Sequence, residues 1–119
     1  MKIAVTSKGQ DLDSELDPRF GRAAYILIVD SESFHFNILD NKENVNAFKG
    51  AGIQAARSVS ESGAEVLVTG FCGPNAFKAL SAANIKVAND ASGTVREAVK
   101  AYLDGKLPLA DKENVNGHW

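Results

Sequence analysis

The sequence has 119 residues, of which 45% are hydrophobic and 24% charged, and its formal net charge is -2. This balance is typical of a folded globular protein and excludes a disordered or fibrous chain. The lack of excess positive charge argues against nucleic acid as the main partner, and no apolar run reaches the roughly 18 residues of a membrane-spanning helix. We therefore expect a cytoplasmic protein. We also expect residues 1–119 to form a single domain, with about the last ten residues as a flexible tail.

The predicted elements alternate between strands and helices. Short β-branched or apolar runs predict strands, and apolar residues at helical spacing that end at a glycine predict helices. In chain order we expect a strand at 2–6, a loop at 10–22, a hairpin of strands at 24–29 and 34–39, a loop at 41–49, a helix at 50–63, a strand at 65–69, a helix from 74, a strand at 85–88 and a helix at 94–105. A hairpin followed by strand-helix units predicts an α/β fold in which a mixed sheet carries helices on both faces.

The apolar pattern also predicts which side chains face the core. Strand 65–69 is a short apolar run that needs burial on both faces, so it should lie centrally beside strand 2–6. The expected inner stripes of the three helices are Ile53, Ala56 and Val59; Phe77, Leu80 and Ala83; and Val95, Ala98, Val99, Tyr102 and Leu103.

Glycines precede each predicted helix, in Gly50-Ala51-Gly52, Gly70-Phe71-Cys72-Gly73 and Gly93-Thr94. In open α/β sheets, ligands bind outside the carboxyl ends of the strands, and the free N–H groups and dipole of a helix start attract anions. Three such starts predict a site for one anionic ligand at this edge. The alternative is that these glycines are only caps and tight turns. The spacing matches neither the phosphate-binding loop nor the dinucleotide fingerprint, so nucleotide binding is not indicated.

Other side chains could complete such a site. Arg19 and Arg22, which flank Phe20-Gly21 in the first loop, could clamp an oxyanion or a sulfide-rich cluster, or could simply be solvated. Cys72 is the only cysteine; near a helix start it should be partly exposed and could bind metal, or it could be a small buried hydrophobic residue. His118 could reach a site from the tail. No catalytic triad or carboxylate pair can be assembled, so we do not expect an enzyme.

Four ordered motifs resemble a known family. They are Asp17-Pro18-Arg19-Phe20-Gly21-Arg22, Gly50 to Ala56, Gly70 to Phe77 and Gly93 to Ala98. Together they resemble the dinitrogenase iron-molybdenum cofactor biosynthesis family, which includes NifX, NafY and the C-terminal domain of NifB, and within it the stand-alone orange-protein type of sulfate reducers. The resemblance implies a ribonuclease H-like fold with a five-stranded mixed sheet in the order 3-2-1-4-5.

The function that the resemblance implies is the binding, carriage or transfer of a preassembled anionic metal-sulfur cluster, molybdenum-iron or molybdenum-copper sulfide, without catalysis. Partners would be cluster-assembly proteins or a partner ATPase, and the chain would be a monomer or weak dimer. An alternative is a regulatory or scaffold module that senses a small anion or docks on a partner. The residues expected at the site are Arg19, Phe20, Gly21, Arg22, Gly50, Gly52, Gly70, Phe71, Cys72, Gly73, Asn75, Gly93 and Thr94, with Cys72 and His118 as candidate metal ligands.

Overall fold

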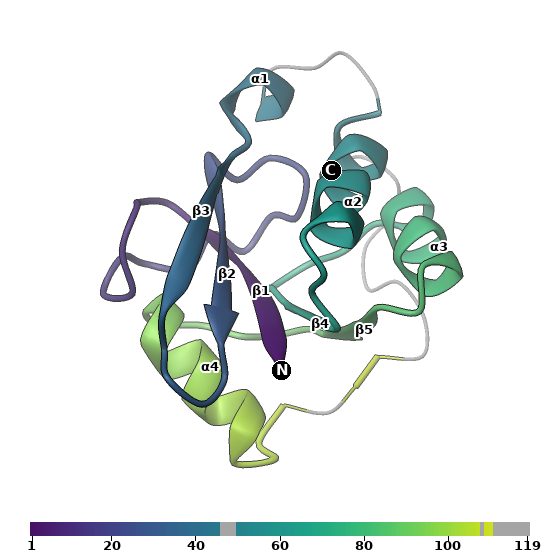
Figure 1. The fold of residues 1–119 in the computed structure, drawn as a ribbon. Helices are drawn as coiled ribbons and strands as arrows, with labels where there is room; N and C mark the ends of the chain where they lie inside the picture. The colour runs from purple at the N-terminus through teal and green to yellow at the C-terminus, as the bar shows by residue number, and fades with distance from the viewer. Residues whose placement is uncertain (46–49, 108, 111–119) are drawn as a thin grey trace.

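The computed structural model describes residues 1–45, 50–107 and 109–110 (Figure 1). Along the chain the elements are β1 (Lys2–Ser7), β2 (Tyr25–Asp30), β3 (Phe36–Asp40), α1 (Lys42–Val45), α2 (Ala51–Glu61), β4 (Val66–Val68), α3 (Pro74–Ala82), β5 (Lys86–Ala88) and α4 (Val95–Leu103). Within the described residues, no helix is both long enough and apolar enough to cross a membrane. The expected tail and His118 lie outside this part of the chain.

The five strands form one mixed sheet in the order β3-β2-β1-β4-β5, which confirms the expected fold. β1 pairs antiparallel with β2, from Lys2↔Asp30 to Ser7↔Tyr25, and β2 pairs antiparallel with β3. β1 and β5 both pair in parallel with β4. The strand β4 therefore lies beside β1 and inside the sheet, as predicted from its apolar sequence. The carboxyl ends of β1, β3, β4 and β5 all meet at one edge of the sheet.

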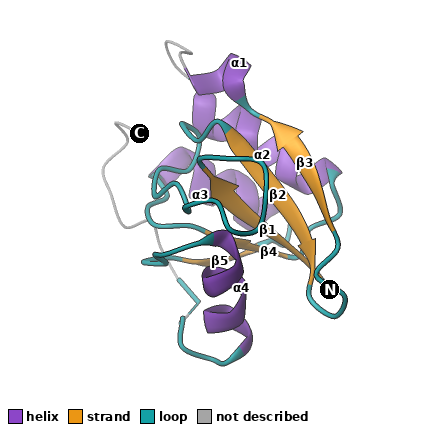
Figure 2. Cartoon of the chain, turned by 90° about the vertical axis from the view of Figure 1, so that its left-hand side faces the viewer, coloured by secondary structure: helices purple, strands orange, loops and turns teal. Residues whose placement is uncertain are grey.

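Helices cover both faces of the sheet. Figures 1 and 2 show α2 and α3 on one face and α4 on the other. Alternate strand residues divide between two cores: Ala4 and Leu67 pack with α2 and α3, whereas Val5 and Val68 pack with α4. This alternation follows from the two-residue period of a β-strand. It decides which polar side chains at the strand ends face α2 and α3.

The helical stripes were predicted only in part. In α2 the buried residues are Ala51, Ala55, Ala56 and Val59, whereas Ile53 is 44% exposed. Steps of three residues fall short of a full helical turn, so Ile53 and Val59 point about 120° apart and cannot share one face. Leu103 of α4 is likewise 42% exposed, and Ala83 lies on the surface after the last residue of α3.

Two boundaries near β3 differ from the prediction. Phe34 has a left-handed backbone with φ of 60°, so the strand begins at Phe36 rather than at Phe34. The segment expected as a loop at 41–49 contains α1, whose first N–H, from Lys42, is capped by the Asp40 carboxylate at 2.9 Å. An aspartate just before a helix is a start signal, and here the polar composition concealed it. Residues 46–49 lie outside the described chain.

Candidate functional site

The long connection between β1 and β2 lies across the carboxyl edge of the sheet and is held by backbone pairs on both sides. On one side, Leu16 donates to the Gly93 carbonyl and Val95 donates to the Ser14 carbonyl, both at 2.9 Å. On the other side, Phe20 donates to the Phe71 carbonyl at 3.1 Å and Phe71 donates to the Pro18 carbonyl at 2.6 Å. The segment predicted as a plain loop is thus fixed against the starts of two different helices.

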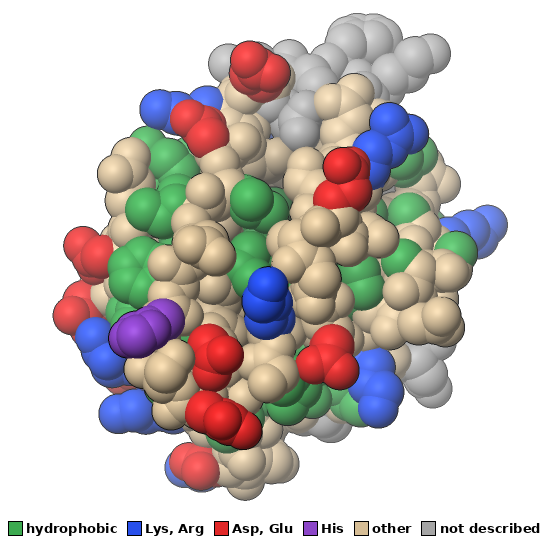
Figure 3. Space-filling model, in the orientation of Figure 1, with side chains coloured by type: hydrophobic (Ala, Val, Ile, Leu, Met, Phe, Trp, Pro, Cys, Tyr) green, Lys and Arg blue, Asp and Glu red, His purple; other side chains and the backbone are tan. Residues whose placement is uncertain are grey.

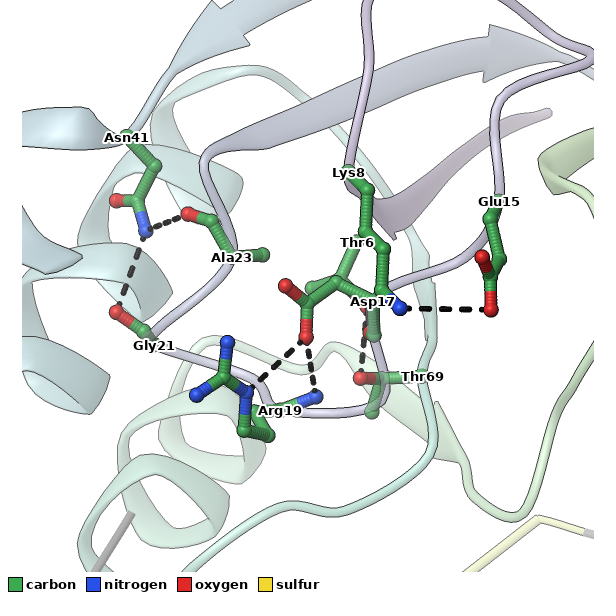
Figure 4. A network of polar contacts seen from close by, with 9 residues as sticks. All are labelled: Thr6, Lys8, Glu15, Asp17, Arg19, Gly21, Ala23, Asn41 and Thr69. Atoms are coloured by element: carbon green, nitrogen blue, oxygen red, sulfur yellow. Dashed lines mark hydrogen bonds and ion pairs between the residues drawn. The ribbon is translucent and has the colours of Figure 1, made fainter.

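A buried aspartate shapes the part of this loop that carries the arginines (Figure 4). The Asp17 carboxylate accepts hydrogen bonds from the backbone N–H of Arg19 at 3.0 Å and from its Nε at 3.4 Å. The Thr6 hydroxyl donates to the Asp17 carbonyl at 2.6 Å. An aspartate that bonds the backbone two residues later forms a turn of defined shape. Asp17 therefore orients Arg19, a role that the Asp-Pro turn signal could have suggested.

A second buried side chain holds the end of the same loop. The Asn41 amide, which lies just after β3, donates to the carbonyls of Gly21 at 3.3 Å and Ala23 at 2.8 Å (Figure 4). Its side chain is almost fully enclosed. The sequence predicted only a polar loop at 41–49, because nothing local shows that a distant turn supplies the hydrogen-bond partners of Asn41.

Glycines let three of the predicted motifs meet at close range. A Cβ atom on Gly21 would lie 3.0 Å from the backbone of Gly52, and one on Gly52 would lie 3.0 Å from the Cβ of Ala76. A Cβ on Gly70 would lie 2.6 Å from the ring of Pro18. A side chain at Gly70 would clash with Pro18, and one at Gly21 or Gly52 would force its neighbours to shift by a few tenths of an ångström. These glycines thus serve close packing. That packing brings the first turns of α2 and α3 together beside residues 17–22, the arginine loop, which carries Arg19 and Arg22.

The starts of α2 and α3 are the anion-attracting feature of this edge. Their N-cap residues are Gly50 and Gly73, and no side chain caps either helix within the described chain. Pro74 at the first position of α3 has no N–H to satisfy. The first-turn N–H groups and the positive ends of two helix dipoles therefore converge where the helices touch.

The start of α4 differs, because its donors are already used within the protein. Thr94 and Glu97 form a capping box, with Glu97 N–H donating to the Thr94 hydroxyl at 3.1 Å and Thr94 N–H donating to the Glu97 carboxylate at 2.9 Å. The N–H groups of Val95 and Arg96 bond the first loop. Gly93 and Thr94 were predicted at the site with the other glycines, but this helix start has no donors left to offer an anion.

The side chains around the two open helix starts differ in their access to solvent. Arg19 is about half exposed, with 48% of its side chain accessible, and it pairs with Asp17. Asn75 is exposed on the first turn of α3, and Arg22 and Phe71 are partly exposed. Phe20 is enclosed in the core at 1% exposure, so it supports the loop and cannot touch a ligand without rearrangement.

Cys72 is a correction to the sequence prediction. Of the two alternatives that the sequence left open, a partly exposed metal ligand and a small buried hydrophobic residue, the structure supports the second. Its exposure is 0% and it packs in the core under α2 and α3, with Sγ 3.8 Å from the Gly73 carbonyl. The short connection from β4 to α3 turns its side chain inward, which a residue's position along the chain does not reveal. Among the described residues, no group of three His, Cys, Asp or Glu side chains could hold a metal ion.

The burial of Cys72 makes a direct prediction. We expect Cys72→Ala to cost about 1 kcal/mol of stability through the small cavity it leaves. The thiol of the folded protein should also react slowly with Ellman's reagent until denaturant is added. Fast labelling of the native protein would show instead that the sulfur is accessible from solvent.

Tyr25 and Lys42, two side chains with shifted pKa values, lie farther along the same edge of the sheet. Gln10 donates to the phenol oxygen of Tyr25 at 2.9 Å, and this bond, followed by the contact with Lys42, lowers the pKa of Tyr25. The pKa of Lys42 is raised, chiefly by Tyr25. Lys42 also lies 3.7 Å from the Asp40 carboxylate, so its charge is already balanced. This group therefore adds little positive potential to the helix starts.

The molecular surface supports a local rather than a long-range attraction for anions. On the face shown in Figure 3, acidic and basic side chains are interspersed and apolar side chains form small patches. With a net charge of -2, the chain does not attract anions as a whole. Attraction of an anion to this edge would therefore be local, from the helix starts and the two arginines.

Comparison with known proteins identifies the family. A model of the family described as dinitrogenase iron-molybdenum cofactor matches residues 1–105. The chain belongs to this family. The orange protein of Desulfovibrio gigas, solved in its apo form, is 48% identical to this chain. The two structures match with a TM-score of 0.93 over 96% of both chains. A NifB-like protein from Thermotoga is 34% identical, with a TM-score of 0.83 over 96% of this chain and 97% of its own.

A more distant relative adds no functional detail. A protein of Methanocaldococcus jannaschii without an assigned function is 28% identical over 109 residues, which cover 90% of this chain and 89% of its own. Family membership associates the chain with the binding or biosynthesis of iron-molybdenum-cofactor-type clusters. The family is associated with a cofactor and is not known as a catalytic family.

Proposed function

We propose that this protein binds a preassembled anionic metal-sulfur cluster at the carboxyl edge of its sheet and carries it to a partner without catalysing a reaction. The observation that supports this most is the contact between the first turns of α2 and α3, two helix starts without side-chain caps. Backbone N–H groups in such a place can bond the sulfide or oxide atoms of a cluster. Arg19 and Arg22 would add charge-assisted hydrogen bonds at the rim.

The nature of the side chains fits a cargo that brings its own sulfur. A cluster with a complete set of sulfides needs few protein ligands, and within the described chain the site offers donors and arginines rather than thiolates or imidazoles. A molybdenum-iron and a molybdenum-copper sulfide both fit this description, and the family description favours a cluster that contains molybdenum. Transfer would then require a cluster-assembly protein as partner, in keeping with the NifB-like relative.

Reconstitution of the purified apo-protein tests this proposal. The protein is incubated with tetrathiomolybdate and Cu(I), or with iron and sulfide, desalted, and analysed for metal content and visible spectrum. We expect a fixed number of molybdenum and copper atoms per chain and charge-transfer bands that differ from those of free tetrathiomolybdate. Metal removed completely by desalting in both mixtures would reject cluster carriage and favour a scaffold role.

A further inference from the structure

Three buried polar side chains lie in a row where the parallel strands end. Thr6 follows the core residue Val5 of β1, Thr69 follows β4 and Asn89 follows β5, and each is less than 10% exposed. Because side chains alternate along a strand, all three fall on the side of Ala4, Leu67 and Val87, which packs against α2 and α3. This is the side on which the two open helix starts lie.

The hydroxyl groups of this row satisfy each other. Thr6 uses its single hydroxyl proton to donate to the Asp17 carbonyl at 2.6 Å. Its 2.8 Å contact with the Thr69 hydroxyl must therefore have Thr69 as the donor. Both threonines thus have assigned roles in holding the loop that presents Arg19.

Asn89 takes no part in the hydrogen bonds between Thr6, Thr69 and the Asp17 carbonyl. Its side chain is 94% buried, since its relative exposure is 6%, and its Oδ1 atom has no hydrogen-bond partner among the described residues. The neighbouring backbone is well fixed, with Thr69 N–H donating to the Ala88 carbonyl at 3.0 Å and Asp90 N–H to the Gly70 carbonyl at 3.0 Å. A buried amide oxygen without a partner destabilises a protein, and an apolar residue would avoid that cost.

We propose that the Asn89 carboxamide is the buried polar contact of the cluster site. On binding, it hydrogen-bonds a terminal sulfide or oxide of the anionic cluster through its N–H groups. A half-turn about the last side-chain bond exchanges the amide oxygen and nitrogen within the same volume, so the donor can face the ligand. This inference rests on the proposed function and adds to it a residue that distinguishes an anion with hydrogen-bond acceptors from a purely apolar ligand.

The variant Asn89→Leu separates this role from a structural one. It keeps the approximate volume and removes the unpartnered amide oxygen, so we expect the melting temperature of the apo-protein to stay the same or rise. The affinity for the tetrathiomolybdate-copper product should fall about tenfold, as for the loss of one hydrogen bond to a charged group. Asn37→Leu, on the exposed edge strand β3, is the matched control and should bind like the parent.

The outcomes are distinct. A lower melting temperature of Asn89→Leu with unchanged cluster affinity would assign Asn89 to the fold, through a bound water, and overturn the inference alone. Uptake of no cluster by the parent and by Asn37→Leu would overturn the proposed function and this inference together. If the leucine variant does not fold, the alanine variants Asn89→Ala and Asn37→Ala allow the same comparison of cluster affinities. Equal affinities for these two variants would contradict the assignment of Asn89.

Discussion

Replacing Arg19 and Arg22 together by alanine is expected to lower cluster affinity about a hundredfold, since each charge-assisted hydrogen bond contributes about 1.5 kcal/mol. If both side chains were simply solvated, as the sequence alone allowed, their loss would leave stability nearly unchanged. Arg19, however, pairs with the buried Asp17 carboxylate, and Arg22 is only partly exposed. We therefore expect an accompanying loss of about 1 kcal/mol of stability, because Asp17 loses part of its hydrogen bonding.

Two comparisons make this result specific to the site. The double variant Lys86→Ala with Lys100→Ala removes the same charge from exposed positions on β5 and α4, and it should retain the cluster. Exchange of both arginines for lysine keeps the charge but not the planar guanidinium group. The cluster affinity of this variant should therefore lie between those of the parent and the double alanine variant. Titration followed by the cluster's visible bands measures all of these. Equal affinities for the parent and the double alanine variant would remove the arginines from the site.

Gly21→Ala should strongly destabilise the protein, with a loss of about 3 kcal/mol. Gly21 has φ of 98°, a conformation that costs alanine free energy in any surroundings. The added methyl group would also lie 3.0 Å from both the N and Cα atoms of Gly52, so the loop and the start of α2 must move apart. Because that contact holds two of the site's elements together, we expect cluster uptake to fall as well.

A matched control separates strain from crowding. Gly50 has a similar φ of 83°, but a Cβ there would meet no atom within 4 Å. Gly50→Ala should therefore lower the free energy of unfolding only by the cost of the left-handed backbone, about 1 kcal/mol. Chemical denaturation of both variants provides the comparison. If the two lose equal stability, the packing of Gly21 on Gly52 is not tight, and the proposed contact between loop and helix is wrong.

The fold could be predicted further than the site, and particular residues show why. Strand β4 has three apolar residues that need burial on both faces, so its central place follows from composition and the parallel pairing. The order of the strands came from the family motifs. The short helix α1 was missed, because its cap on Asp40 was a weak signal in a polar segment.

The site depends on contacts between residues far apart in the sequence, and these limited its prediction. The glycines at the helix starts were correctly placed at one edge, but Gly21, Gly52 and Gly70 prove to serve close packing between segments. The inward direction of Cys72 and the capping of α4 by its own Glu97 follow from local geometry that a residue's position does not specify. Asn89 carried no signal at all, because an unpartnered amide becomes visible only when its surroundings are known.

The location of the bound cluster is the central claim, and amide chemical shifts test it most directly. Tetrathiomolybdate and Cu(I) are both diamagnetic, so two-dimensional 15N-1H spectra of the labelled apo-protein and the reconstituted protein can be compared residue by residue. We expect the largest shifts in residues 17–22, 50–53 and 70–76, where the arginine loop meets the starts of α2 and α3. The start of α4 should change little, since its donors are already bonded. Largest shifts along α4 or β3, with residues 70–76 unchanged, would contradict the site.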